Sequence, residues 1–193
     1  MHDDVLHKAL SSIAPVSAAM IDMLREEARP RRLAKDEHLL RAGDPATSIA
    51  VVVEGLLREY FPLADGTERT KAFILESQLS GSLADLLRGG RSTASIVAEE
   101  PTSVLLVPFA TFAARADSEH AWGTLARRAT EALLLRKADR EYALLALDAD
   151  ARYSRFQRDY PGLESRIRAR HIASYLGITA VHLSRLRRKR QEP

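Results

Sequence analysis

The residues best suited to chemistry lie near the C-terminus, where a short helical motif is surrounded by cations. Residues 171–186 read as two helices joined by a turn. Gly177 stands where the first helix should end with a left-handed backbone, and Thr179 is a good N-cap for the second helix. Ala173 is small enough for the two helices to cross closely. The apolar faces that would hold the pair together are Ile172, Leu176, Leu183 and Leu186. This spacing predicts a helix-turn-helix.

The second helix of this motif should present its other face to a partner. That face has small residues at its N-terminal end, which permit close approach, and donors further along for base edges. Its members are Ala180, Val181, Ser184, Arg185 and Arg188. Arg185 is the best candidate for a bidentate contact to guanine. We therefore predict that residues 180–190 bind in the major groove of double-stranded DNA.

Further donors around the motif are candidates for contacts to the DNA backbone. The free amides beside Thr179 can also hold a phosphate at the start of the second helix. The candidates are Arg168, Arg170, His171, Thr179, Arg187, Lys189 and Arg190. The alternative interpretation of this segment is a plain helical hairpin with a solvated basic face.

Charge is distributed unevenly along the 193 residues, whose formal net charge is +3. Residues 151–193 contain ten Arg and one Lys against three acidic residues, a net charge of +8, so residues 1–150 carry −5. An acidic body with a basic end favours contact with a polyanion such as nucleic acid, a solvated surface being the alternative.

The composition excludes several classes of function. The absence of cysteine rules out disulfides, thiolate metal sites and cysteine nucleophiles. No two histidines have metal-ligand spacing, and no nucleophile elbow, Walker loop or zinc-protease motif is present, so we expect no catalytic residue, no metal site and no enzymatic activity. We also expect no signal peptide and no membrane span, which makes a cytoplasmic location the default.

The elements that must position the motif are predicted to change from helices to strands along the chain. Residues 3–29 read as helix, with Pro15 opening a second helix and Pro30 ending it. Short apolar segments between turns then predict a β sandwich or barrel up to Pro108. The expected strands are residues 37–40, 48–53, 56–61, 70–75, 95–97 and 103–107, with a short helix at 82–87.

A long helix is predicted for residues 118–147, which are rich in Ala, Leu, Arg and Glu. Leu133, Leu134 and Leu135 stand in a row, so the helix is apolar on more than one face. Such a helix packs against another subunit or another domain, or else is a core helix of its own domain. Asp148 is a candidate N-cap for the next helix, residues 151–159.

The chain resembles the Crp/Fnr family of bacterial transcription regulators in two regions. One is residues 172–179 together with 183–185. The other comprises Leu40–Asp44, Val53–Arg58, Gly81–Leu83 and Arg91–Ala94. The resemblance implies an α+β chain with three parts. These are a cyclic-nucleotide-binding-like jelly roll at 1–117, a dimerisation helix at 118–147, and a helix-turn-helix domain of winged-helix type, with a truncated wing, at 148–193.

The resemblance also implies an effector pocket, from which this sequence departs. The corresponding positions are Gly81, Ser82, Leu83, Arg91 and Ser92. In nucleotide-binding members a glutamate stands where this chain has Ser82, and it accepts a hydrogen bond from the ribose hydroxyl. Arg91 and Ser92 can still hold an anion with the amides of the short helix. Loss of the carboxylate argues against cyclic AMP, so we expect no cofactor and an unidentified effector.

The functional hypothesis is a homodimeric regulator that binds a palindromic DNA site. RNA polymerase and a small-molecule effector are further candidate partners, and no membrane is expected. Val181 stands where many family members carry a base-reading glutamate, so the preferred DNA sequence should differ. The alternative hypothesis is a ligand-sensing or protein-interaction module that no longer binds DNA.

Overall fold

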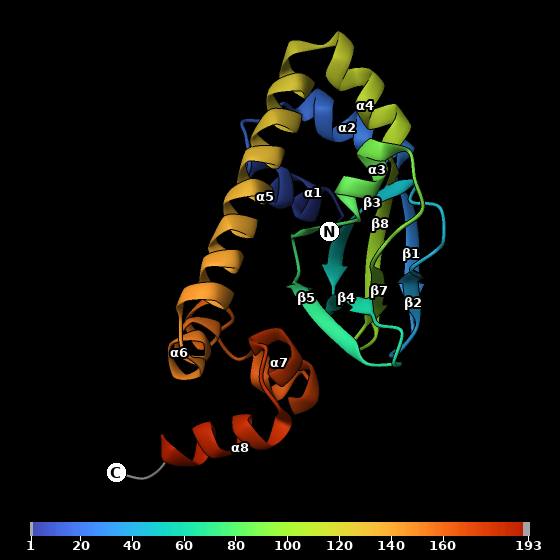
Figure 1. Ribbon diagram of the computed structural model, residues 1–193. Helices are drawn as coiled ribbons and strands as arrows, with labels where there is room; N and C mark the ends of the chain where they lie inside the picture. The colour runs from blue at the N-terminus through green and yellow to red at the C-terminus, as the bar shows by residue number, and fades with distance from the viewer. Residues whose placement is uncertain (1, 191–193) are drawn as a thin grey trace.

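The computed structural model describes residues 2–190 as a two-sheet β roll with helices before and after it (Figure 1). Both sheets are antiparallel and have four strands, in the orders β1-β8-β3-β6 and β2-β7-β4-β5. The strands are β1 (Arg29–Leu33), β2 (His38–Leu40), β3 (Ser48–Glu54), β4 (Leu57–Pro62), β5 (Glu68–Ile74), β6 (Leu79–Ser80), β7 (Ser95–Ala98) and β8 (Thr102–Pro108). The α+β fold expected from the sequence is confirmed.

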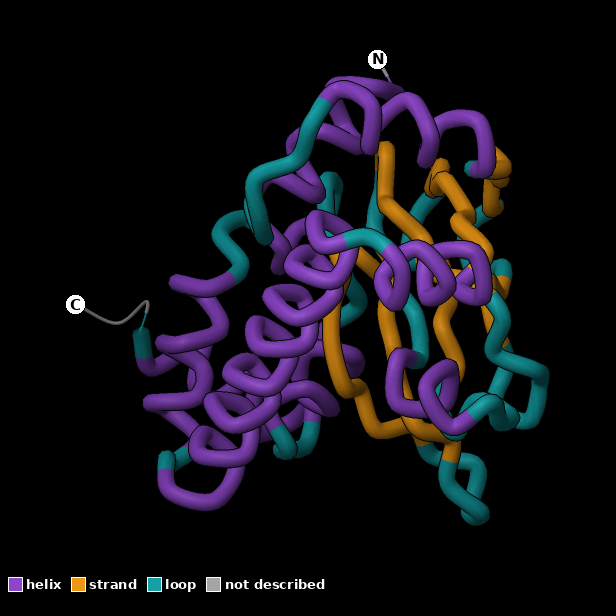
Figure 2. The backbone as a smooth tube through the Cα atoms, turned by 90° about the horizontal axis from the view of Figure 1, so that it is seen from above, coloured by secondary structure: helices purple, strands orange, loops and turns teal. Residues whose placement is uncertain are grey.

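The helices gather at the two ends of the chain, apart from one short helix within the roll. They are α1 (His2–Ser11), α2 (Ala18–Glu27), α3 (Leu83–Arg88), α4 (Phe109–Ser118), α5 (His120–Ala146), α6 (Ala149–Asp159), α7 (Ala169–Leu176) and α8 (Ala180–Lys189), with a single 3₁₀ turn at Leu163–Ser165. In Figure 2 the strands lie on one side of the view and the C-terminal helices on the other.

The expected helix boundaries near the N-terminus are wrong in two places. Pro15 does not open α2; Ser17 does, because its hydroxyl accepts from the backbone N–H of Met20 at 3.3 Å. Pro30 does not end that helix but lies inside β1. β1 is an edge strand, where a missing N–H costs no ladder hydrogen bond. The sequence also gave no separate signal for β1 or for the two-residue strand β6.

Two apolar cores hold the roll and its covering helices. The inner core fills the space between the sheets, and its largest fully buried members include Leu57, Ile96 and Val52. The outer core packs α1, α2 and α4 against β3 and β8, with Trp122 at the start of α5 buried among them. The first turns of α5 are therefore anchored to the roll.

The long helix α5 leads from the roll to the C-terminal helices (Figure 1). Its 27 residues correspond to a length of about 40 Å. Asp148 caps the next helix as predicted, its Oδ1 accepting from the backbone N–H of Ala151 at 2.8 Å. A third core then joins α6, α7 and α8 around Phe156, Ile172 and Leu183, which are fully buried.

Candidate nucleic-acid interface

The turn between α7 and α8 has the geometry that the sequence predicts. Gly177 has a φ of 68°, in the left-handed region, and its N–H bonds back to the carbonyls of Ala173 and Ser174. Thr179 caps α8, because its Oγ1 accepts from the backbone N–H of His182 at 3.1 Å. The turn therefore fixes the angle between the two helices.

One side of α8 is buried and the opposite side is exposed. Leu183 and Leu186 pack on α7 and α6, which turns the other face of the helix to solvent. All five residues that we expected to read bases lie on that exposed face: Ala180, Val181, Ser184, Arg185 and Arg188. Val181 is 63% exposed. In Figure 1, α8 lies at the end of the molecule away from most of the roll.

Cations on this face form no ion pair among the described residues 2–190. Arg185, Arg188 and Lys189 are exposed, and only Lys189 lies near enough to an acidic side chain, Asp150, to lower its pKa. Arg170, at the start of α7, is also exposed and donates from Nε to Nε2 of His171 at 3.1 Å. The surface can therefore offer positive charge to a polyanion.

Three other candidate phosphate ligands are held in ion pairs inside the chain. Arg168 pairs with Asp36 at 2.7 Å, Arg187 with Glu164 at 2.8 Å, and Arg190 with Asp150 at 3.0 Å. The contact with Asp36 raises the pKa of Arg168 further above neutrality. Each of these arginines would have to exchange its carboxylate for a phosphate to contact DNA.

His171 does not lie on the surface, so a phosphate contact does not fit this conformation. Its ring is 4% exposed, and Nδ1 lies 2.8 and 2.9 Å from the two carboxylate oxygens of Glu99. Glu99 also accepts from Nε of Arg58 at 2.5 Å. Burial alone would raise the pKa of Glu99, but the hydrogen bonds with His171 and Arg58 outweigh it and lower that pKa. His171 thus joins α7 to the roll.

This buried contact belongs to a wider interface that sequence reasoning missed. Arg166 contacts both Glu76 and Glu100 at 2.6 Å. The hydroxyl of Ser174 accepts from the backbone N–H of Thr70 and donates to the carbonyl of Glu68. Glu99 and Glu100 read in the sequence as a turn between strands, and nothing in their spacing pointed to partners some 70 residues away.

The loop before α3, where an effector anion was expected, is filled by a carboxylate of the chain itself. Asp85 is buried and accepts from Oγ of Ser82 at 2.5 Å, and from the backbone N–H and Oγ1 of Thr93 at 3.0 Å each. These hydrogen bonds, led by the one from Ser82, lower the pKa of Asp85 to about 2. The carboxylate is therefore ionised and takes up the hydroxyl of Ser82 before α3 and both donors of Thr93 after it.

The other candidate pocket residues are not brought together. Arg91 is exposed and donates from Nη1 to the carbonyl of Gly43 at 2.7 Å. Ser92 is buried, and its hydroxyl bonds to the carbonyl of Ala94. Gly81 and Leu83, by contrast, line a wide cleft of about 770 Å³ between the roll, α3, α5 and the C-terminal helices, to which Ser82, Arg91 and Ser92 do not contribute.

No helix within residues 2–190 has the length and apolar character needed to cross a bilayer. No group of three or more His, Asp or Glu side chains in that range is placed to hold a metal ion.

Comparison with known proteins identifies a matching domain family and solved structures with a similar architecture. Residues 30–119 match the cyclic nucleotide-binding domain family. The structure of FixK2 from Bradyrhizobium japonicum is 25% identical with a TM-score of 0.74, over 84% of this chain and 83% of that one. The catabolite activator protein of Thermus thermophilus is 24% identical, with a TM-score of 0.58 over 95% and 87% of the two chains.

A third structure, from Eubacterium rectale, is assigned to the Crp/Fnr family of transcriptional regulators. It is 18% identical, with a TM-score of 0.69 over 91% of this chain and 84% of that one. At this level of identity the likeness shows a shared fold. A search of the curated proteins found no significant match to the sequence.

Proposed function

We propose that the protein regulates transcription by binding double-stranded DNA as a homodimer. The premise is that residues 30–119 match the cyclic nucleotide-binding domain family and that the chain shares the architecture of Crp/Fnr regulators. The role places the protein in the cytoplasm, with RNA polymerase as a candidate partner. No enzymatic activity forms part of this proposal.

The observation that carries the proposal is the two-sided character of α8. Leu183 and Leu186 fix the helix to its neighbours, and the opposite face presents Arg185 and Arg188 to solvent without an acidic partner in residues 2–190. A helix held in this way fits a major groove, with small residues at its start and guanidinium groups further along. The capped N-terminus of α8, at Thr179, adds donors for one phosphate.

A second surface supports the homodimer. Leu135, Ala138, Tyr142 and Leu145 are exposed along one side of α5, where Leu145 also borders the wide cleft, and they recur at intervals of three, four and three residues. This is the spacing of a coiled-coil seam. A two-fold pairing along it would repeat α8 on the other half of the dimer. Two major grooves on one face of DNA are about 34–36 Å apart, so the site should be palindromic.

In this proposal the effector pocket has lost the features needed to bind a cyclic nucleotide. Asp85 already occupies the Ser82 hydroxyl and the donors of Thr93, and a phosphate brought there would meet its negative charge. Arg91 is turned to the carbonyl of Gly43 rather than into the wide cleft. We therefore expect cyclic AMP to bind weakly or not at all.

Selection of duplex DNA from a random pool, followed by a band-shift titration, tests the proposal. We expect a palindromic site whose affinity falls steeply with salt, because cations displace counterions from the phosphates. Arg185→Ala should weaken binding by roughly ten- to a hundredfold and relax preference at one base pair, the effect of losing about 1–3 kcal/mol of base contact. Arg32→Ala, an exposed arginine on β1, is the matched control.

A second candidate function is a sensor that acts through a protein partner without binding DNA. The ion pairs of Arg168, Arg187 and Arg190 favour it, because they withhold three cations from a phosphate backbone. The same titration separates the two functions. A purified dimer that shifts no duplex at low salt would exclude the first function and leave the second.

A further inference from the structure

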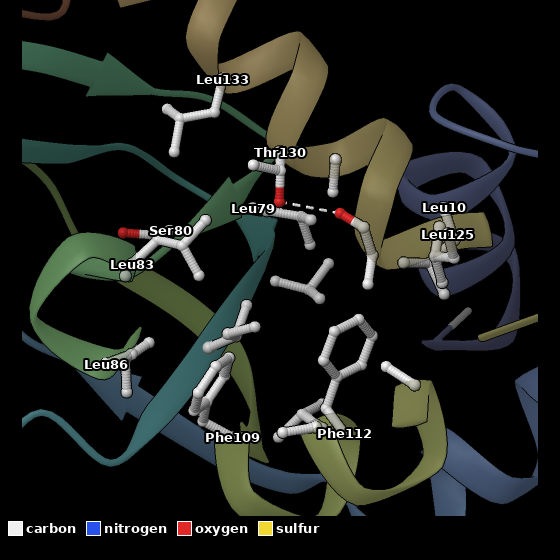
Figure 3. A pocket seen from close by; sticks show the side chains of 18 of the residues that line it. Leu10, Leu79, Ser80, Leu83, Leu86, Phe109, Phe112, Leu125, Thr130 and Leu133 are labelled. Carbon is white, nitrogen blue, oxygen red and sulfur yellow. Dashed lines mark hydrogen bonds between the residues drawn. The ribbon is translucent and has the colours of Figure 1, made fainter. Parts of the chain in front are cut away.

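An apolar cavity of about 300 Å³ lies between α5 and the outer side of the roll, apart from the helix-turn-helix (Figure 3). Phe109 and Phe112 of α4 line one side of it, and Leu125 and Leu133 of α5 lie across from them. Small-molecule sites in proteins have volumes from about 300 Å³ upward and are mainly apolar. The cavity therefore has the size and the surface of a ligand site.

The cavity is elongated along α5. The α5 residues that line it run from Leu125 to Arg136, which spans about 16 Å at 1.5 Å per residue. Thr130 lies between them, but its hydroxyl already donates to the carbonyl of Ala126 at 2.9 Å. An extended aliphatic chain matches this long and mainly apolar lining.

Polar groups without partners lie at one end, where the cavity adjoins the wide cleft. Ser80 and Arg136 line both spaces. Ser80 is 5% exposed, and its hydroxyl has no hydrogen-bond partner among the described residues. Arg136 is exposed and has no hydrogen bond or ion pair in residues 2–190. A buried hydroxyl without a partner is costly. Rotation of the Ser80 side chain toward the cavity would let its hydroxyl donate to a ligand oxygen.

The charges at the cavity ends set the direction of a ligand. Arg136 marks the end next to the wide cleft, whereas Asp117 of α4 is the acidic residue in the lining. An anionic head group is favoured beside the guanidinium and disfavoured beside the carboxylate. We propose that this cavity binds a medium-chain aliphatic monocarboxylate, with its chain between α4 and α5 and its carboxylate at Arg136 and Ser80.

A second copy of the chain is not the occupant that this geometry favours. The α5 residues that line the cavity face the roll, whereas the seam of Leu135, Ala138, Tyr142 and Leu145 lies on a different side of the helix. A dimer formed along that seam would leave the cavity open to a ligand. A monocarboxylate bound here would be the effector of the proposed regulator. Only its effect on DNA binding rests on the proposed function; the binding itself does not.

The chain's single tryptophan supplies a direct readout. Trp122 is buried and packs edge-on against Phe112, with ring centroids 5.9 Å apart, and Phe112 lines the cavity. Titration of the full-length protein with decanoate below its micelle concentration should change the fluorescence of Trp122 to saturation, with one decanoate per chain. Decylammonium, which has the same chain length and the opposite charge, should produce no saturable change.

Variants assign the binding to this cavity. Arg136→Gln should weaken decanoate binding at least tenfold, because it removes a charged hydrogen-bond donor. Ser80→Ala should weaken it severalfold without lowering the thermal stability of the protein. Arg128→Gln changes an arginine of α5 that lines neither space and should leave the affinity unchanged.

A substitution that fills the cavity provides an independent test of ligand binding. Ala129→Phe places a ring in the cavity and should abolish the response while circular dichroism stays unchanged. If that variant does not fold, the comparison of Arg136→Gln with Arg128→Gln decides. Equal responses to decanoate and decylammonium, equal affinities of those two variants, or a fluorescence that changes only with protein concentration would overturn the proposal. None of these measurements involves DNA, so they fail or succeed independently of DNA binding.

Discussion

At the scale of single residues, the arginines near the C-terminal end differ in their surroundings rather than in type. Arg185 and Arg188 point into solvent, whereas Arg168 and Arg187 contact carboxylates of the same chain. An ion pair at an exposed position is weak because water and salt screen it. The paired arginines are therefore a reserve of positive charge that a phosphate backbone can recruit.

Asp36→Asn tests whether Arg168 belongs to that reserve. Asp36 has a φ of 66°, and asparagine tolerates the left-handed region, so the backbone should not change. With Arg168 released, we expect tighter binding to duplex DNA and a salt dependence steeper by about one charge per protomer. The slope of log affinity against log salt, measured by fluorescence anisotropy, checks this. An unchanged slope together with an unchanged affinity would show that Arg168 does not contact phosphate.

Asp85→Asn tests the carboxylate that fills the loop before α3. Because the side chain is buried and accepts from Ser82 and Thr93, the substitution should lower the free energy of unfolding by about 1–3 kcal/mol at pH 7. The pKa of Asp85 is lowered from 3.8 to about 2. Its stabilising contribution is therefore complete above pH 3.8 and is lost as the pH falls toward 2.

Urea unfolding of the wild type and Asp85→Asn across that range measures the effect. The stability difference between them should be constant from pH 7 down to about pH 4 and should shrink below it. A difference that is independent of pH would mean that the ionised carboxylate is not what the loop requires.

At the scale of elements, the contact between α7 and β5 joins the helix-turn-helix to the roll. Phe73 of β5 is buried against Phe156, Tyr160 and Tyr175, with ring centroids 5.3 to 6.2 Å apart. Arg140 of α5 stacks on Tyr175 at 3.9 Å and also donates to its carbonyl. The helix-turn-helix is therefore positioned by packing of α7 against both the roll and α5.

Phe73→Ala should break this contact. Replacing a fully packed phenylalanine by alanine costs about 3–5 kcal/mol, since apolar burial is lost and a cavity remains. We expect the helix-turn-helix and the roll to unfold in two separate steps instead of one, measured by Tyr and Trp fluorescence against far-UV circular dichroism. Phe61→Ala, on the exposed part of β4, is the control and should retain the wild-type transition. A single transition in both variants would show that the domains are coupled elsewhere.

At the scale of the whole molecule, α5 has two different apolar sides. One side lines the cavity against the roll, and the other exposes Leu135 and Leu145, which are 66% and 80% exposed. Large apolar side chains in one exposed stripe mark an interaction surface. The helix can thus serve the roll and a second copy at the same time.

Leu135→Glu tests the seam. A charge within a coiled-coil interface removes apolar burial and, in a parallel two-fold pair, sets two carboxylates against each other. We expect a folded monomer by light scattering, with circular dichroism unchanged and affinity for a palindromic duplex strongly reduced. Leu63, in the turn between β4 and β5, is also an exposed leucine, and the control variant Leu63→Glu should remain a dimer. A dimeric Leu135→Glu variant would place the interface elsewhere.

Most of the fold was predictable because local patterns determine it. Alternating apolar segments bounded by turns located six of the eight strands, and Gly177, Thr179 and Asp148 marked helix ends through chemistry that acts within a few residues. The resemblance to the Crp/Fnr family is confirmed by the match of residues 30–119 to the cyclic nucleotide-binding domain family and by the structural likeness to FixK2.

The sequence by itself therefore determined the kinds of element, their order and the face of α8 that stays exposed. Only the tertiary structure decided which charges remain free. Whether His171 reaches a phosphate depends on Glu99, 72 residues away, and whether Ser82 meets an effector depends on Asp85 turning into the same loop. Burial and ion pairing are properties of three-dimensional neighbours, and no spacing along the chain records them.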